Sequence, residues 1–291
     1  MKKVIGVFGN PNRHWVGDGF PVRTLFSYDG LGQYVSPFLL FDYAGPWRFD
    51  PETRPRGVGE HPHRGFETVT IVYDGEVAHR DSTGQGGVIG PGDVQWMTAG
   101  SGILHQEFHT PDFTARGGPF RMVQLWVNLP AARKMTTPGY QAIEAADIPS
   151  VELAPGASAR VIAGELAGAR GPARTFTPLN LWDLRLDRGA SVRLPLPEGH
   201  TAALAVLSGR VRVDGAQAAG EAEIVVLGVD GADAQVDADA DTTLLVMTGE
   251  PIDEPIVGYG PFVMNTEDEI QKAISDLRTG RFGAIAQDRA H

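Results

Sequence analysis

The sequence predicts an all-β fold, and three observations support this prediction. Short runs rich in β-branched and aromatic residues recur along most of the chain, as in Glu67–Tyr73 and Leu179–Leu186. The 37 glycines and 21 prolines are scattered without a period, which is typical of tight turns between strands. A chain of 291 residues is also longer than one core usually serves, so we expect about two domains.

The expected strands form two series separated by a segment that proline and glycine interrupt. The first series covers Val4–Phe8, Pro37–Tyr43, Glu67–Tyr73, Val94–Thr98, Ile103–Phe108 and Met122–Val127. The second covers Ser158–Ala163, Leu179–Leu186, Ala202–Val213, Glu223–Gly228 and Thr243–Thr248. Because Pro130, Pro138 and Pro149 break the segment between them, we expect two β domains of similar size, 1–133 and 134–291.

One helix is expected near the C-terminus, at about 266–279. Thr266 is a good N-cap and is followed by three acidic residues, which favour the positive end of a helix dipole. Apolar residues then recur with helical spacing from Ile270 to Leu277, and Gly280 supplies a stop signal.

Composition excludes several classes of protein. The chain has no cysteine, which removes disulfides, thiolate metal sites and cysteine nucleophiles. Its net charge of −11 repels phosphate backbones and anionic lipids, so we expect no direct nucleic-acid binding and no membrane association. No apolar run approaches the ~18 residues of a membrane span, and the first apolar run is too short for a signal peptide. We therefore expect a cytoplasmic protein.

Five of the eight histidines fall between residues 61 and 109, and four of these five form two groups with strand spacing. If the chain is extended, His61, His63 and Glu67 leave it on one face, because side chains alternate along a strand. By the same rule His105, Glu107 and His109 share a face. Neighbouring strands would bring both groups to one point inside a barrel. Imidazoles with a carboxylate suit a divalent first-row ion, and iron(II), manganese, nickel and copper all remain open.

Three blocks of sequence resemble a known family. The His61-x-His63-x3-Glu67 pattern and the glycine-framed His105 resemble the two cupin motifs. HPHRGFETVT (61–70), VQWMTAGSGILHQE (94–107) and GEPIDEPIVGYGPFVMN (249–265) are more closely similar to the pirin family, over residues 1 to about 283. This resemblance implies a bicupin, with two cupin-type β-sandwich barrels of which only the N-terminal one holds a metal, a non-haem iron.

The resemblance also implies a ligand set and leaves three residues open. The family's metal ligands fall on His61, His63, His105 and Glu107. An ordinary cupin would use Glu67 as its carboxylate ligand, whereas in a pirin Glu67 would orient an imidazole instead. His109 either contacts a ligand or belongs to the core. The second half has only His200, so we expect that domain to be metal-free, as a structural part or a docking surface.

Two functions from different classes are implied by the resemblance. The first is a quercetin 2,3-dioxygenase-type oxidoreductase, which cleaves a flavonol with O₂ and releases carbon monoxide. It would use one divalent ion, iron(II) first and manganese, nickel, copper or cobalt as alternatives, with Glu107 accepting the proton of the 3-hydroxyl. The alternative is a non-enzymatic, iron-dependent, redox-responsive protein that regulates a transcription factor or metabolic enzyme. The acidic charge fits a protein partner better than DNA.

Overall fold

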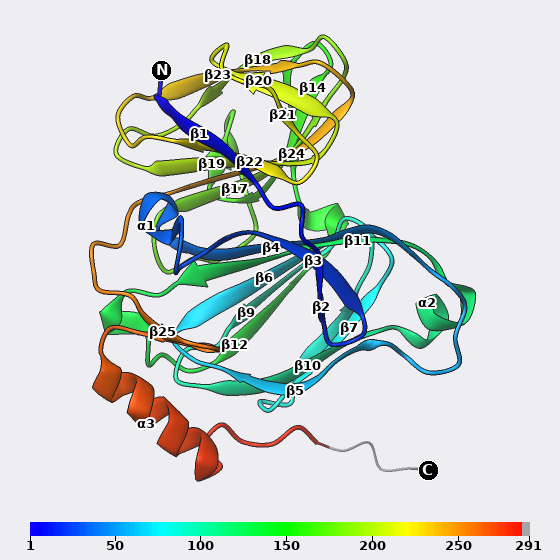
Figure 1. Cartoon of the computed structure of the whole chain (residues 1–291), viewed down its shortest axis with the longest axis vertical. Coiled ribbons are helices and arrows are strands. Elements are labelled where there is room, and N and C mark those ends of the chain that lie inside the picture. The colour runs from blue at the N-terminus through cyan, green and yellow to red at the C-terminus, as the bar shows by residue number, and fades with distance from the viewer. Residues whose placement is uncertain (287–291) are drawn as a thin grey trace. The chain divides into compact units, whose positions relative to one another are not determined.

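Strands are the main regular structure of the protein and helices are few, which confirms the predicted all-β fold. The structure is a computed structural model that describes residues 1–286. The chain forms two compact units, which we describe separately (Figure 1). The histidine unit comprises residues 13–22, 41–145 and 253–286, and the 146–252 unit also includes residues 1–12 and 23–40.

Two antiparallel sheets make up the barrel of the histidine unit. The larger sheet has the order β12 (Gly139–Ile143), β9 (Val94–Thr98), β6 (Phe66–Asp74), β11 (Gly118–Asn128), β4 (Phe38–Phe49), β3 (Phe20–Ser27) and β2 (His14–Val16). The smaller sheet has the order β5 (Gly57–His63), β10 (Ile103–His109), β7 (Val77–Asp81) and β8 (Gly86–Ile89). Aromatic residues dominate the core at one end of this barrel, among them Phe49, Phe113 and Phe120.

The 146–252 unit repeats the same architecture. Its larger sheet has the order β1 (Val4–Gly9), β22 (Glu223–Leu227), β19 (Thr201–Ser208), β24 (Thr242–Gly249), β17 (Leu179–Leu186), β14 (Ala157–Ala163) and β13 (Ser150–Ala154). Its smaller sheet has the order β18 (Ser191–Pro195), β23 (Asp233–Ala238), β20 (Arg210–Val213) and β21 (Ala219–Gly220). The strands β5 to β11 thus correspond one by one, and in sheet position, to β18 to β24. This common order supports the duplication that the two strand series suggest.

The unit boundaries differ from the expected division at 133/134. β1 lies at the edge of the 146–252 unit, where it pairs with β22, and β12 takes the matching place beside β9 in the histidine unit. An edge strand leaves a row of unpaired backbone groups, and these two segments cover such edges. Residues 253–286, which we had expected in the second domain, also belong to the histidine unit.

The helices are few. α3 (Glu267–Arg278) confirms the predicted C-terminal helix, because the Thr266 side chain accepts a hydrogen bond from the Glu269 backbone and Glu269 reaches back in a capping box. It lies beside the β25 (Val257–Tyr259) and β26 (Phe262–Met264) hairpin (Figure 1). The others are α1 (Gly32–Val35), α2 (Pro111–Arg116), η1 (Ala131–Arg133) and η2 (Ala145–Asp147), and a last hairpin joins β15 (Glu165–Leu166) to β16 (Ala169–Arg170). Within residues 1–286, no helix is long and apolar enough to cross a membrane.

Two glycines divide segments that we expected to be continuous. Gly209 (φ +83°) ends β19 and starts the turn into β20, so the expected strand Ala202–Val213 is two strands in different sheets. Gly65 (φ +91°) does the same between β5 and β6. A Cβ on Gly65 would lie 2.0 Å from the carbonyl oxygen of Val263, so this position requires glycine for its backbone conformation and for space.

The two constraints on Gly65 can be separated with a matched glycine. Gly84 also has positive φ (+81°), but a Cβ there would meet no atom within 4 Å. We expect Gly84→Ala to lower the free energy of unfolding by about 1 to 2 kcal/mol, the cost of the left-handed conformation alone. Gly65→Ala should cost clearly more, because the clash with Val263 adds to it. Urea unfolding of both variants measures the difference, and equal losses would contradict the close approach at Gly65.

Candidate metal centre

Three imidazoles from two adjacent strands converge in the histidine unit. β5 carries His61 and His63, and β10 places His105 directly opposite His61 in the ladder. The ring centroids are 4.2 Å apart for His61 and His105, 4.8 Å for His63 and His105, and 5.0 Å for His61 and His63. One nitrogen from each of the three rings lies within 4.8 Å of the other two. The alternation of side chains along both strands therefore brings together the histidines that the sequence singled out.

Three ring nitrogens of His63 and His105 are buried without a protein partner. No described residue forms a hydrogen bond of normal geometry with either ring nitrogen of His63 or with Nε2 of His105. His61 is held through Nδ1, which lies 2.8 Å from the carbonyl oxygen of Gly59, so its Nε2 is left for another contact. A buried polar atom without a partner is costly, and a cluster of them is typical of a site that receives a ligand.

Burial also fixes the charge of the cluster. It holds the pKa values of His63 and His105 well below the usual 6.5, and the neighbouring imidazoles lower them further. Both rings are therefore neutral at neutral pH. A neutral imidazole is the form that coordinates a metal ion, so these residues fit such a group.

Glu107 brings a carboxylate to the His105 side of this cluster, where its ligand atom groups with those of His105 and His79 and not with those of His61 and His63. In β10 the residues His105, Glu107 and His109 are buried and alternate with the half-buried Leu104, Gln106 and Phe108. The Glu107 carboxylate accepts hydrogen bonds from Gln124 (3.0 Å), Gln95 (3.2 Å) and Thr70 (3.4 Å). These donors come from three neighbouring strands of the larger sheet, so the barrel interior fixes the position of the carboxylate.

His79 is a residue of the site that the sequence analysis did not assign. It lies on β7, and with His105 and Glu107 it forms a second group whose ligand atoms lie within 4.8 Å of one another. Its Nδ1 is 3.3 Å from Nδ1 of His105, and its Nε2 is 3.3 Å from the carboxylate of Asp81. The alternation of buried Val77, His79 and Asp81 along one strand is the signal that could have revealed it.

Glu67 does not contact an imidazole, contrary to the expectation. The turn at Gly65 places it on β6, three residues before Thr70, whose side chain reaches Glu107. Because three is an odd number, Glu67 lies on the opposite face of the sheet, where it accepts a hydrogen bond from Thr98 (2.7 Å). Burial raises its pKa to about 7, although the hydrogen bond from Thr98 opposes this shift.

His109 belongs to the aromatic core. Its ring packs against Phe49, Phe113 and Phe120, with centroids 4.6 to 5.1 Å away, and its Nε2 lies 3.0 Å from the carbonyl oxygen of Gly19. Burial lowers its pKa to about 4, so the ring is neutral. The open question about His109 is therefore resolved in favour of packing.

The end of β5 that carries His63 is fastened to the C-terminal segment. Arg64 is 3% exposed, and its guanidinium pairs with Asp276 of α3 (3.0 Å), donates to the Ser101 carbonyl (2.8 Å) and lies over the ring of Phe282. Lys134 donates to the carbonyls of Gly65 and Val263, both at 2.9 Å. These contacts connect the chain next to His63 with residues that lie far from 61–109 in the sequence.

The chain is similar to known proteins over nearly its whole length. Residues 19–127 match the family model described as Pirin, and residues 181–283 match the Pirin C-terminal cupin domain. A Pseudomonas aeruginosa protein provisionally named quercetin 2,3-dioxygenase is 58% identical over 97% of this chain and 99% of its own length. Human pirin is 40% identical over 86% of this chain and 83% of its own length. The crystal structure of quercetin 2,3-dioxygenase from Acinetobacter baumannii has 57% identity and a TM-score of 0.96, and the match covers 98% of this chain and 100% of that one.

The raised pKa of Glu67 predicts a pH dependence of stability. An unfolded glutamate loses its proton near pH 4.5, whereas folded Glu67 keeps it to about pH 7. The folded state binds more protons in this window, so its stability should fall as the pH rises from about 4.5 to about 7. Glu67→Gln cannot ionise, and it should gain stability relative to the wild type across the same window. Urea unfolding of the chelator-treated proteins at pH 5 and pH 8 tests this, and an identical change in both proteins would contradict it.

Proposed function

The chain belongs to the pirin family, and from this premise we propose that it is a metal-dependent dioxygenase that cleaves a flavonol such as quercetin with release of carbon monoxide. The observation that carries the proposal is the set of buried, neutral imidazoles whose nitrogens lack protein partners, next to a positioned carboxylate. The names of the relatives with 58% and 57% identity support the choice of substrate class.

The proposed ligands of one divalent ion are His61, His63, His105 and Glu107. The three histidines have free nitrogens, and Glu107 follows His105 by two residues on the same face of β10. Nitrogen and carboxylate donors without sulfur suit iron(II), which is our first choice, and manganese, nickel, copper or cobalt also suit this donor set. When bound, such an ion acts as a Lewis acid that polarises the oxygens of the reactants.

His79 acts through His105 in this proposal. If Nε2 of His105 binds the metal, its Nδ1–H is a donor, and the nearest acceptor is Nδ1 of His79. That assignment leaves Nε2–H of His79 to donate to Asp81. The hydrogen-bonded series of Asp81, His79 and His105 therefore fixes the tautomer of the proposed ligand His105. This is the role that we had expected of Glu67.

Glu107 is the proposed catalytic residue. Its carboxylate accepts the proton of the flavonol 3-hydroxyl, and the side chains of Gln95, Gln124 and Thr70 hold it in place while it does so. Glu107 is 2% exposed, so the proton moves in a site from which bulk water is largely excluded. The flavonol itself supplies the electrons for O₂, so the reaction needs no further reductant.

The surroundings of His63 suit a planar aromatic substrate. Phe66 and Trp126 stack on each other at 4.3 Å, and each lies close to the His63 ring, at 5.2 and 5.3 Å. His61 is the half-buried member of the proposed ligand set, whereas the other three ligands are buried. Phe66 is fully buried and Trp126 is half-buried, so we infer that the substrate enters on the His61 side and packs against Trp126.

Asp81→Asn should weaken metal binding by about 10- to 100-fold, because it removes the charge that orients His79 and through it His105. Asparagine keeps an oxygen for the backbone N–H groups of Thr83 and Gln85, which Asp81 now serves. Competition with a chelator measures the affinity. Asp74→Asn, at a half-exposed position on β6 paired with Arg121, is the control and should leave the affinity unchanged. An unchanged affinity in Asp81→Asn would contradict the role of His79.

The dioxygenase proposal predicts metal-dependent oxygen uptake with quercetin, loss of the yellow absorbance of quercetin and release of carbon monoxide. Glu107→Gln should be slower than its residual metal content explains, because the proton acceptor is lost as well as a ligand. An oxygen electrode, with rates normalised to bound metal, measures both effects.

If no form loaded with iron, manganese, nickel, copper or cobalt consumes oxygen with any flavonol, the dioxygenase proposal is wrong. The redox-responsive interaction protein then becomes the better hypothesis. It predicts a partner affinity that differs between the iron(II) and iron(III) forms.

A further inference from the structure

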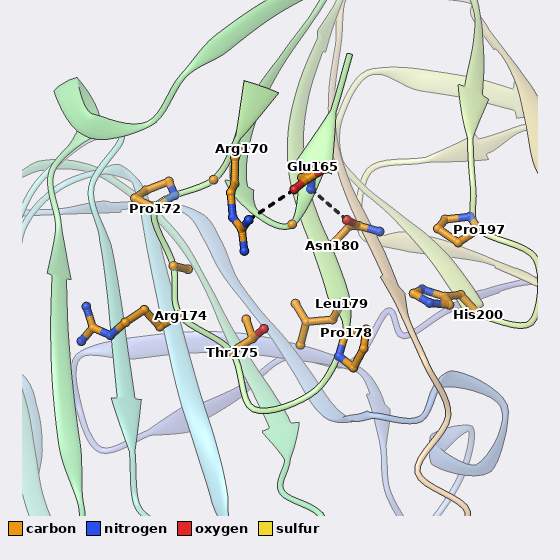
Figure 2. A pocket seen from close by; sticks show the side chains of 13 residues that line it. Glu165, Arg170, Pro172, Arg174, Thr175, Pro178, Leu179, Asn180, Pro197 and His200 are labelled. Atoms are coloured by element: carbon orange, nitrogen blue, oxygen red, sulfur yellow. Dashed lines mark hydrogen bonds and ion pairs between the residues drawn. The ribbon is translucent and has the colours of Figure 1, made fainter. Parts of the chain in front are cut away.

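The 146–252 unit contains a cavity of about 580 Å³ that the proposed function does not use (Figure 2). Its lining includes Arg170, Asn180 and His200, and apolar surface is supplied by Pro178 and Leu179. Figure 2 shows Arg170 and His200 on opposite sides of the cavity, with Leu179 and Asn180 between them.

This cavity lies at the end of the barrel that corresponds to the metal centre of the histidine unit. β19 lies between β22 and β24 just as β6 lies between β9 and β11. Pro197 and His200, which line the cavity, lie in the loop between β18 and β19, and this loop corresponds to the turn between β5 and β6 that follows His63. The duplicated barrel thus keeps a hollow where its counterpart gathers imidazoles, but it has different side chains there.

A chain of hydrogen bonds inside the cavity fixes the orientation of His200. Asn180 accepts from the backbone N–H of Glu165 (3.1 Å) and donates to the hydroxyl oxygen of Thr248 (2.9 Å). The Thr248 hydroxyl also lies 3.5 Å from Nδ1 of His200. We assign the hydroxyl proton to this contact, and with Nδ1 as the acceptor a neutral His200 carries its proton on Nε2. Burial lowers the pKa of His200 from its usual 6.5, which favours this neutral form.

The polar part of the cavity therefore presents donors. His200 offers Nε2–H, and Arg170 offers its guanidinium from the other side. Arg170 pairs with Glu165 at 3.5 Å, but the two side chains are 82% and 71% exposed. An ion pair that exposed contributes little, so an incoming anion can compete with Glu165 for the guanidinium. A second arginine, Arg174, also lines the cavity, although the chain as a whole carries a net charge of −11.

We propose that this cavity binds a small organic carboxylate that has a second oxygen acceptor at its other end. The carboxylate pairs with Arg170, the second oxygen accepts from Nε2–H of His200, and the apolar body lies against Pro178 and Leu179. An arginine forms strong, charge-assisted hydrogen bonds with a carboxylate, which gives the site its preference for an acid. The site is separate from the proposed metal centre, and the inference does not depend on the dioxygenase proposal.

The test uses 4-hydroxybenzoate as the probe, with isothermal titration calorimetry on the full-length, metal-loaded protein. We expect saturable binding that weakens by about tenfold or more in Arg170→Ala and in His200→Phe, since each loses one hydrogen bond to a charged or oriented group. Thr248→Val should weaken it as well, because His200 loses the contact that fixes its tautomer. The neutral 4-hydroxybenzamide and benzoate, which lacks the second oxygen, should each bind more weakly than the probe.

The matched control is Arg212→Ala, which removes an exposed arginine of the same unit that pairs with Asp239, just after the end of β23. It should bind 4-hydroxybenzoate like the wild type. Equal binding of the benzamide, or full affinity in both Arg170→Ala and His200→Phe, would overturn the proposal. Binding that disappears only when the metal is removed would place the probe at the other site and would also overturn it. His200→Leu, which also lacks a donor, repeats the test if His200→Phe does not fold.

Discussion

The structure depends on one unfavourable arrangement, the burial of His63 and His105 with three ring nitrogens that find no hydrogen-bond partner among the described residues. Desolvation keeps the rings neutral, and crowding keeps them neutral even where a single histidine would be protonated. An arrangement of this kind costs free energy unless something satisfies the nitrogens. The surrounding contacts hold it in place: the β5–β10 ladder sets the spacing, Arg64 ties the end of β5 to α3, and His79 faces His105 from β7. A divalent ion resolves the cost, which is why we place the function here.

The same strand order produces two different sites. In the histidine unit the barrel end holds imidazoles and a carboxylate, and in the 146–252 unit it holds a cavity with His200, Asn180 and Arg170. The sheets that carry them correspond strand by strand, so the difference lies in the side chains at the rim. Proline stands at position 195, the last residue of β18, where the matching last residue of β5 is His63. A fold alone therefore does not determine what each barrel binds.

Much of the fold and of the centre could be predicted from the sequence, because both follow from local periodicity. Leu179–Leu186 and Val94–Thr98 are strands with the predicted bounds, and the capping box at Thr266 starts the predicted helix. The shared face of His105 and Glu107 follows from alternation within one strand. Alternation failed for Glu67 because Gly65 interrupts the strand, and His79 was missed because its contact with His105 depends on the pairing of β7 with β10. The sequence also did not predict that β1 belongs to the 146–252 unit and that the segment after residue 252 belongs to the histidine unit. These placements depend on which sheet edges need a strand.

Anomalous diffraction at the metal absorption edge, from crystals of the full chain reconstituted with iron(II), tests the central claim most directly. The account predicts one peak per chain, in contact with Nε2 of His61 and His105, one nitrogen of His63 and the carboxylate of Glu107. It also predicts that the Asp81 carboxylate remains on His79 and does not touch the ion. A peak bound by His79 without His61 and His63, or a peak in the 146–252 unit, would contradict it.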